Sequence, residues 1–517
     1  MGERNSGKNC GYFAVGGILR RESSSETMMT MDRMKQLRNR MPVVCAGLGL
    51  ALATVPGAVQ AQQNPSSLLN PFYGSVTAGK ATDAVLALSL DDAVRRGLQT
   101  NLGLKEAEAG EQSLHGEELE ALQEFLPTVT VSGGTGVHEY NLAALGFGPS
   151  VIGKFSALLP PNTNLSGFSL ITKADVTNGQ VNYDQTLYSG PVINGYKAVR
   201  AAEKVAYFQK MTARGEVVQQ VATAYLRVIA AESDVENAQA LLESDRVLAS
   251  QAEAKHAAGT APRLDVLRAQ VELQQQQQRL LASENVRDKA EILLKREIGV
   301  APGQPIQLTD PAPYSDLVEQ SEAQLLASAY QNRQDYQNLT AQAKANYYVM
   351  KARQSERLPT LSFSGNYGVT SVSGVGAHGT MIAMGKLQVP IFREASLRGE
   401  TDVARAQLQG VERQLASLRA QIVEQVRSAQ LDAEAAGKLL EVARSNVDLA
   451  RQALADETDR YKAGVDDTLP LVRAQAQLAN AESNLVQSLY QYNLSKLALA
   501  RSTGVIELQY RSYLGEK

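Results

Sequence analysis

The chain has 517 residues, with 51 Lys and Arg against 54 Asp and Glu, a formal net charge of −3 and no tryptophan. A small net charge without a basic stripe excludes nucleic acid as an expected partner. Aromatic residues make up only 5% of the chain, and Ala, Gln, Leu and Arg dominate from about residue 190 onward. This composition favours long helices over a wide, aromatic-rich core.

The N-terminal part of the chain predicts export. A positively charged cluster at 35–40 precedes an apolar run over 43–55, and small residues surround Ala61. This order is typical of a secretory signal peptide, here over 31–61 with cleavage after Ala61, and the run is too short for a permanent transmembrane helix. A buried core helix is the alternative interpretation.

The only two cysteines, Cys10 and Cys45, precede the predicted cleavage point. We therefore expect neither a disulfide framework nor a cysteine-ligated metal in the mature chain. Cys45 begins the apolar run instead of ending it, and the residues before it lack a small-residue pattern. We expect no lipid anchor there.

A repeat organises the rest of the sequence. Leu126–Gly133 (LPTVTVSG) recurs as Leu358–Gly365 (LPTLSFSG), so the residue number shifts by 359 − 127 = 232. Later landmarks have smaller shifts: Gly464 repeats Gly259 with a shift of 205, and Ile391 repeats Leu187 with a shift of 204. The sequence therefore contains two copies of one unit.

The change of shift from 232 to 204 predicts an extra segment of about 28 residues in the first copy. Residues 141–169, rich in Gly, Pro, Leu and Asn, fit a longer surface loop at a hairpin tip. The expected divisions are a non-native or disordered extension over 1–30, the signal peptide, a linker over 62–87, a first repeat over 88–310, a second repeat over 311–505 and a tail over 506–517.

The sequence pattern of each copy predicts, in order, a helix, two strands, a very long helix and another helix. Strand alternation follows the Leu-Pro pair, because apolar and polar residues point in opposite directions there (Leu361, Phe363 and Tyr367 against Ser362, Ser364 and Asn366). We expect the return strands near 175–187 and 380–391, each close to the roughly 9–11 residues that cross a membrane.

The long helix of the second copy has a coiled-coil seam with one local stutter. Its positions are Leu408, Val411, Leu415, Leu418, Ile422, Val426, Ala429, Ala433, Ala436, Leu440, Ala443, Val447, Ala450 and Leu454. A helix of roughly 65 residues extends about 100 Å and must pack against other long helices. Gly259 and Gly464 end the two long helices, so each copy predicts a helical hairpin.

Four strands per chain cannot close a barrel, and an open edge in lipid leaves backbone groups unpaired. If these strands enter a membrane, several chains must share them. Two chains supply eight strands, and three supply twelve with room for a channel. The strand count permits a trimer without proving one.

The doubled order, the Leu-Pro-Thr strand openings, Asn332–Asp335, Arg460–Gly464 and the Leu88–Ala93 opening resemble the TolC-type outer membrane efflux family over about 88–505. The resemblance implies a mainly α-helical homotrimer whose membrane β-structure is a shared twelve-stranded barrel, continued by an α-helical tunnel. It implies passive export through the outer membrane, with helices reaching into the periplasm. The partners are a periplasmic adaptor and, through it, an inner-membrane pump.

The resemblance places the adaptor contacts and the closed end at the hairpin tips, here 255–264 and 460–469. The candidate tip residues are Gly259, Arg460, Tyr461 and Gly464. Arg460 and Tyr461 could hold the closed tip by polar contacts between hairpins, or could simply pack at the surface.

Some members of this family carry an acidic ring just inside the second tip. This sequence departs from that pattern, because Pro470 and Arg473 occupy the aligned positions. The acidic residues nearby are Asp265, Asp466 and Asp467, which threefold repetition would gather near the axis. The alternative is that they cap and solvate helix starts.

No catalytic triad, phosphate-binding loop or paired-carboxylate pattern occurs, so we expect no enzymatic activity. The histidines show no metal-ligand spacing, and we expect neither a metal nor a cofactor (His115, His138, His256 and His378). Two other functions compete. A periplasmic adaptor should have a single hairpin between β-rich domains, and a structural coiled-coil protein would not need matched strands in both copies.

Overall fold

The computed structural model describes residues 70–76, 80–141, 154, 171–317, 320–373, 376–463 and 468–515. The predicted extension, signal peptide and cleavage point lie outside these ranges, as does nearly all of the predicted loop at 141–169. All elements below belong to one compact unit, 65–517.

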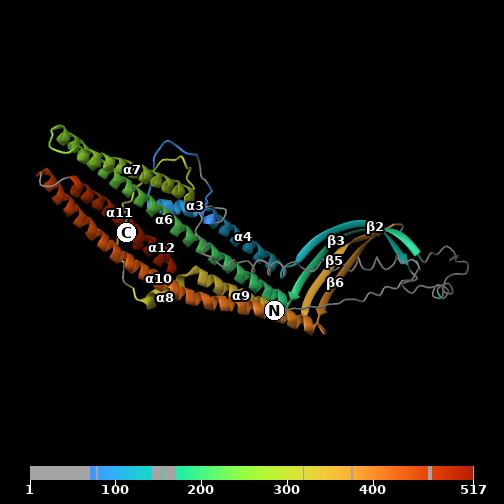
Figure 1. Ribbon diagram of the computed structural model, residues 1–517. Helices are drawn as coiled ribbons and strands as arrows, with labels where there is room; N and C mark the ends of the chain where they lie inside the picture. Colours follow the sequence, from blue (N-terminus) through green and yellow to red (C-terminus); the bar gives the residue numbers. More distant parts are fainter. Residues whose placement is uncertain are drawn as a thin grey trace, which may run out of the picture. The chain divides into compact units, whose positions relative to one another are not determined.

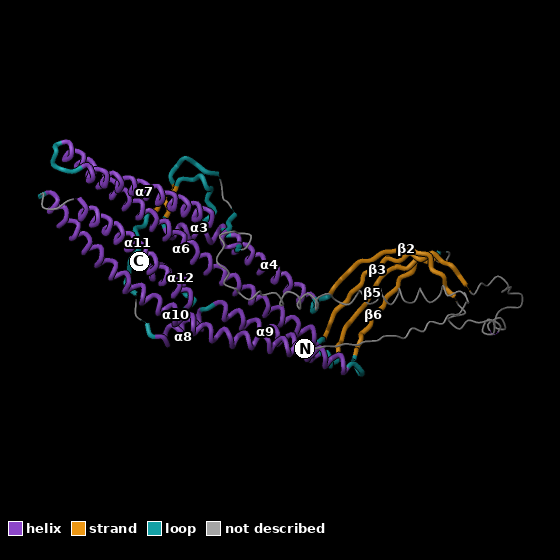
Figure 2. The backbone as a smooth tube through the Cα atoms, in the orientation of Figure 1, coloured by secondary structure: helices purple, strands orange, loops and turns teal. Residues whose placement is uncertain are grey.

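Two very long helices, each followed by a shorter partner, alternate with two pairs of long strands (Figures 1 and 2). The elements in chain order are η1 (Pro71–Tyr73), β1 (Leu86–Leu88), α3 (Leu90–Thr100), α4 (Leu102–Gln123), β2 (Thr128–Asn141), β3 (Ile171–Tyr188), α6 (Gly190–Ala257), α7 (Arg263–Glu297), β4 (Ile306–Leu308), α8 (Glu322–Asn332), α9 (Gln334–Ser355), β5 (Thr360–Val372), β6 (Gly376–Gln388), α10 (Glu394–Lys462), α11 (Thr468–Ser502) and α12 (Ile506–Leu514).

The helical hairpins form as the sequence predicts. Helices α6 and α10 have 68 and 69 residues, which corresponds to about 100 Å each. Helix α6 packs against α7, α10 packs against α11, and α11 also packs against α6. All fourteen predicted seam positions of α10 are buried or half-buried. The seam therefore accounts for the packing of this helix.

The four longer strands form an antiparallel sheet in the order β2-β3-β5-β6. They have 14, 18, 13 and 13 residues, longer than expected. The second return strand ends at Gln388 and not at Ile391 as predicted. Pro390 explains the early end, because proline has no N–H for the strand ladder.

The sheet has an apolar and a polar face. In most pairs of the sheet, the two partners are either both odd-numbered or both even-numbered. Odd-numbered residues therefore share one face of the sheet, and even-numbered residues share the other. The odd face carries mostly apolar side chains (Val129, Val131, Val137, Val181, Tyr183, Leu361, Phe363, Tyr367, Val369, Met381, Ala383 and Leu387). The even face is mostly polar (Thr130, Ser132, Gln180, Asn182, Asp184, Ser362, Ser364, Asn366, Lys386 and Gln388).

The repeat is also visible in three dimensions. Gly299 and Gly504 are related by the same shift as the two tip glycines, and both have positive φ, at 70° and 77°. A Cβ on Gly299 would lie 2.7 Å from the side chain of Thr100, and one on Gly504 would lie 2.7 Å from the carbonyl carbon of Asn332. Thr100 and Asn332 are themselves related by the shift of the Leu-Pro pairs. In each repeat, the glycine that follows the last helix of the hairpin therefore packs against the junction between the first two helices, α3 and α4 in the first repeat and α8 and α9 in the second.

A small parallel pair, β1 with β4, was not predicted from the sequence. The Tyr225 hydroxyl lies within hydrogen-bond distance of the Leu88 carbonyl and of Asp310 Oδ2, 3.0 Å from each, which ties this pair to α6. Strands of three residues are too short to show periodicity. Within the segment expected as a linker, Tyr73 is buried and Leu86 begins β1.

In the described part of the chain, no helix is both long and apolar enough to cross a bilayer.

Candidate functional site at the hairpin tips

The first hairpin turns in a compact, glycine-terminated cap. Helix α6 ends at Ala257, and Gly259 adopts φ 72°. The Thr260 amide donates to the Lys255 carbonyl at 2.9 Å and the Gly259 amide to the His256 carbonyl at 2.9 Å. This pattern satisfies the last carbonyls of the helix with a left-handed residue, as predicted for Gly259.

The second tip is described only in part. Helix α10 ends at Lys462 and α11 begins at Thr468. The predicted tip residue Gly464 and the acidic residues Asp466 and Asp467 lie outside the described residues.

Tyr461 joins the two hairpins near their tips. Its side chain, 6% exposed, packs in an apolar cluster with Leu248 and Ala252 of α6 and Leu471 of α11. The Nζ of Lys255 lies 3.5 Å from the centroid of the Tyr461 ring. An ammonium over an aromatic face is attracted by the ring quadrupole. Tyr461 thus contributes to the inter-hairpin core.

Arg460 and Asp265 have different environments. The Arg460 side chain is exposed, and its Nε lies 4.0 Å from Glu457 Oε2. Asp265 is 7% exposed in the first turn of α7, where its Oδ1 lies 3.5 Å from Arg268 Nη1. An acidic side chain in a first turn interacts favourably with the helix dipole. This placement fits the helix-start alternative for Asp265.

A buried carboxyl that was not predicted from the sequence lies farther along α6. Asp245 is 2% exposed, and its Oδ1 has no hydrogen-bond partner among the described residues. Burial, and secondarily the charge of Glu272, raises the pKa of Asp245 to about 7. Asp245 follows Leu241 and precedes Leu248 at seam spacing, and a charge at a seam position is the signal that could have revealed it.

Polar contacts connect the hairpins along their length. The Gln475 side chain of α11 donates to Ser244 Oγ of α6 at 2.9 Å. Ser483 of α11 donates to Asp234 of α6 at 3.4 Å. These contacts hold α11 against α6 by hydrogen bonds as well as by packing.

A pocket of about 810 Å³ lies between α10, α11 and α12. Its wall includes Lys496, which is 1% exposed. The Nζ of Lys496 donates to the Ser315 carbonyl and Oγ, both at 3.1 Å, and burial lowers the pKa of this lysine to about 8. Lys496 thereby anchors the segment that joins the two repeats.

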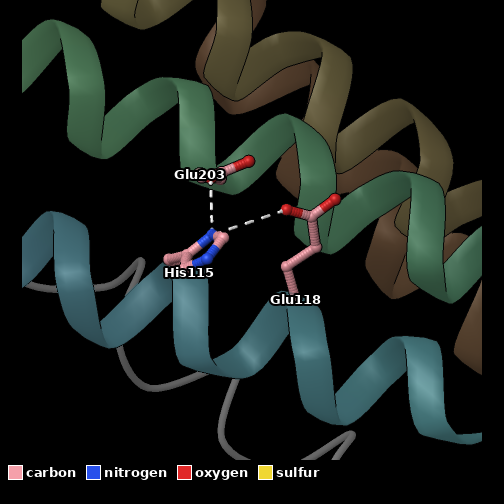
Figure 3. Close-up of side chains that lie close together, drawn as sticks. All are labelled: His115, Glu118 and Glu203. Atoms are coloured by element: carbon pink, nitrogen blue, oxygen red, sulfur yellow. Dashed lines mark hydrogen bonds and ion pairs between the residues drawn. The ribbon is translucent and has the colours of Figure 1, made fainter.

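One histidine and two carboxylates gather between α4 and α6 (Figure 3). His115 Nδ1 lies 3.1 Å from Glu203 Oε1 and 3.9 Å from Glu118 Oε2. The Tyr196 hydroxyl donates to Glu118 Oε1 at 3.1 Å. His115 is 58% exposed, as expected of a surface residue. The spacing of the histidines alone did not predict this group. Hydrogen bonds within it explain its geometry as a contact between two helices.

The family model described as "Outer membrane efflux protein" matches residues 93–300 and 325–505. The chain belongs to this family. The two matched segments correspond to the two hairpin-containing halves of the fold. The efflux protein is therefore an outer-membrane efflux channel protein by family and fold.

Known proteins similar to this efflux protein agree with that assignment. Nodulation protein T of Rhizobium leguminosarum bv. trifolii is 22% identical over 332 residues, covering 62% of this chain and 69% of the relative. The CmeC outer membrane channel of Campylobacter jejuni has a TM-score of 0.65 at 16% identity, covering 84% of this chain and 92% of that chain.

Two further solved structures have the same fold as the efflux protein. The outer membrane protein VceC of Vibrio cholerae has a TM-score of 0.63 at 17% identity, with 80% and 96% of the two chains covered. The MtrE outer membrane channel of Neisseria gonorrhoeae, in its open state, has a TM-score of 0.64 at 17% identity, with 83% and 94% covered. Family membership thus indicates a channel and not an enzyme.

Proposed function

We propose that this chain is the outer-membrane subunit of a tripartite efflux or type I secretion system. Three copies share twelve strands in one barrel, and their helical hairpins form a tunnel in the periplasm. The barrel conducts passively to the exterior, while an inner-membrane pump supplies the energy through a periplasmic adaptor.

The amphipathic four-stranded sheet carries this proposal. Its apolar face suits lipid and its polar face suits a water-filled interior. Both edge strands, β2 and β6, are exposed along their described residues, whereas β3 and β5 are partly covered. A long open edge cannot remain unpaired in a bilayer, because each unpaired backbone group costs several kcal/mol there. Sharing strands between copies removes both edges at once.

The hairpin tips are the proposed adaptor contact. Gly259 adopts a positive φ in the first turn, and Gly464 is its counterpart in the second repeat of the sequence. Arg460 presents an exposed cation near the end of α10. Tyr461 supports this surface from within, since its ring is buried between the hairpins. We expect adaptor binding to depend directly on Arg460 and indirectly on Tyr461.

An acidic ring near the tips is a further part of the proposal. Asp265, Asp466 and Asp467 would each occur three times around the axis, where they would favour cations. The ion pair between Asp265 and Arg268 favours a helix-start role for that residue. We therefore propose that Asp466 and Asp467, and not Asp265, form the acidic ring.

The two rival functions fit the molecule less well. A periplasmic adaptor requires one hairpin between β-rich domains, whereas the described chain has two hairpins and four paired long strands. A structural coiled-coil function does not require the amphipathic four-stranded sheet that this chain has.

Reconstitution of the purified protein into planar lipid bilayers tests the proposal. Outer-membrane fractionation establishes the starting material, and stepwise ionic conductance without added nucleotide is the expected result. A protein that fractionates with the inner membrane or the soluble periplasm, and gives no conductance, would contradict the proposed function.

A further inference from the structure

The two strand hairpins of the chain are related by a fixed shift in residue number. Thr128 pairs with Asp184 in β2–β3, and Thr360 pairs with Gln388 in β5–β6. Adding 232 to a β2 number and 204 to its β3 partner gives a β5–β6 pair. This relation holds for every β5–β6 pair. The last example is the pair of Tyr140 with Thr172, which corresponds to the pair of Val372 with Gly376. The sequence repeat is therefore also a repeat of strand register.

The contact between the two repeats is the pairing of β3 with β5. Val181 pairs with Tyr367, and the register is constant from Val176 with Val372 to Thr186 with Ser362. In a ring of identical chains, the next contact of the same kind joins β6 to β2 of a neighbouring copy. Adding 204 to each β3 number gives the β6 residue, and subtracting 232 from its β5 partner gives the β2 residue of the neighbouring copy.

We infer that β6 pairs antiparallel with β2 of a second copy of this chain, in the register that places Ala383 opposite Val137. The inference deepens the proposed function, since it rests on the proposed sharing of strands between copies. The pairs run from Thr380 opposite Tyr140 to Gln388 opposite Ser132, and the two numbers of each pair add up to 520.

This register preserves the faces of the sheet. Odd-numbered residues of β6 meet odd-numbered residues of β2, so the apolar face continues from one copy to the next. A slip of one residue would put apolar side chains on the polar face. A slip of two residues keeps apolar side chains on the apolar face. The alternation of the two faces therefore does not distinguish the inferred register from registers that differ by two residues.

Side-chain size separates the inferred register from the two-residue slips. In the inferred register, Met384, Lys386 and Leu387 lie opposite Gly136, Gly134 and Gly133 of the neighbour. In a slip of two residues in either direction, at most one of these three β6 residues faces a glycine. Large side chains opposite glycine relieve crowding between neighbouring strands.

The helices support the same contact independently. Helix α9 packs against both α6 of the first repeat and α10 of its own repeat. Its equivalent in the first repeat, α4, packs against α6 but lacks the equivalent second neighbour within the described chain. The shift between repeats identifies that neighbour as α10 of the copy whose β6 pairs with β2. Strands and helices therefore indicate the same neighbouring surface.

Disulfide cross-linking tests the register. The described residues contain no cysteine, and we would combine Ala383→Cys with Val137→Cys in the full chain. Two offset controls combine Ala383→Cys with Thr135→Cys or with Glu139→Cys, and all these positions share one face. Residues directly opposite have Cα atoms about 4.5–5.5 Å apart. A two-residue offset adds about 6.8 Å along the strand, which takes the Cα atoms beyond the roughly 7 Å limit for a disulfide.

A link within one chain is excluded by the sheet order, because β3 and β5 lie between β2 and β6. Brief oxidation should give covalent trimer on non-reducing gels, with on the order of tenfold more product for Ala383/Val137 than for either offset pair. Each single-cysteine variant should give no trimer. Heat-modifiable migration and native mass in mild detergent establish that every variant has assembled.

Stronger linking of an offset pair, or no linking in protein that is trimeric by native mass, would overturn the register and leave the proposed function intact. Protein that is folded but monomeric by native mass would overturn both. The two failures are therefore distinguishable.

Discussion

Lys255 and Tyr461 lie on different hairpins, and the Lys255 ammonium stands 3.5 Å from the Tyr461 ring centroid. The ring also fills an apolar cluster that includes Leu248 and Ala252. This contact joins the ends of α6 and α10 within one chain, so the two tips should open and close as a coupled pair.

Removal of the Tyr461 ring should loosen both tips. Tyr461→Ala deletes a buried ring and should destabilise the tip by about 3 kcal/mol. Tyr461→Phe keeps the ring and its attraction for Lys255, so it should behave like the unchanged protein. Hydrogen exchange of amides in 248–257 measures the effect. Equal exchange in both variants would refute the bridging role of the ring.

The Asp245 carboxyl should make tip stability depend on pH. Its pKa rises from about 3.8 in the unfolded chain to about 7 in the folded chain, so the folded state binds the proton more tightly. Stability should be greatest below the unfolded pKa, fall as pH rises between the two values, and level off above pH 7.

Asp245→Asn should remove this dependence and slow amide exchange around residue 245 at pH 7.5. Glu297→Gln is the matched control, because burial also raises the pKa of Glu297, to about 8, at the C-terminal end of a different helix, α7. That control should leave exchange near residue 245 unchanged. A pH profile that persists in Asp245→Asn would rule out this carboxyl as its source.

Two glycines with similar backbone angles should differ in their tolerance of alanine. Gly259→Ala introduces strain of about 1 kcal/mol from φ 72°, with open space around the new Cβ. Gly504→Ala adds the same strain and puts its Cβ 2.6 Å from the Arg333 amide nitrogen. A forced backbone shift adds about 1–3 kcal/mol.

Thermal unfolding of the two variants in detergent measures the difference. The Gly504 variant should lose clearly more stability than the Gly259 variant. Equal losses would mean that the close contact at the junction between α8 and α9 has no energetic importance.

The acidic-ring proposal predicts unequal effects on ion selectivity. Asp466→Asn combined with Asp467→Asn should reduce the cation preference of the channel, because it removes six charges from a trimer. Asp265→Asn should change selectivity less, since the Asp265 side chain is buried and only 7% exposed. Reversal potentials under a salt gradient measure both. A larger shift for Asp265→Asn would reverse the assignment.

The main elements were predictable because their signals are long. The seam from Leu408 to Leu454 extends over many turns, and the Leu-Pro-Thr openings mark the same strand in both copies. Length and repetition make such patterns readable without the fold.

The rest depended on contacts between distant residues. Glu272, whose charge acts on Asp245, lies on α7, and the apolar neighbours of Tyr461 lie on other helices. Strand β1 pairs with β4, which follows the whole first helical hairpin in the chain. No local spacing in the sequence encodes these meetings. The sequence also placed the end of the second return strand three residues too late, because the apolar pattern continues past Pro390.

Native mass spectrometry of the purified protein in mild detergent tests the shared barrel most directly. We expect a mass of three chains, with the folded assembly converting to single chains only after heating. A fully folded single chain under the same conditions would contradict it, because its two exposed sheet edges would then have no partner.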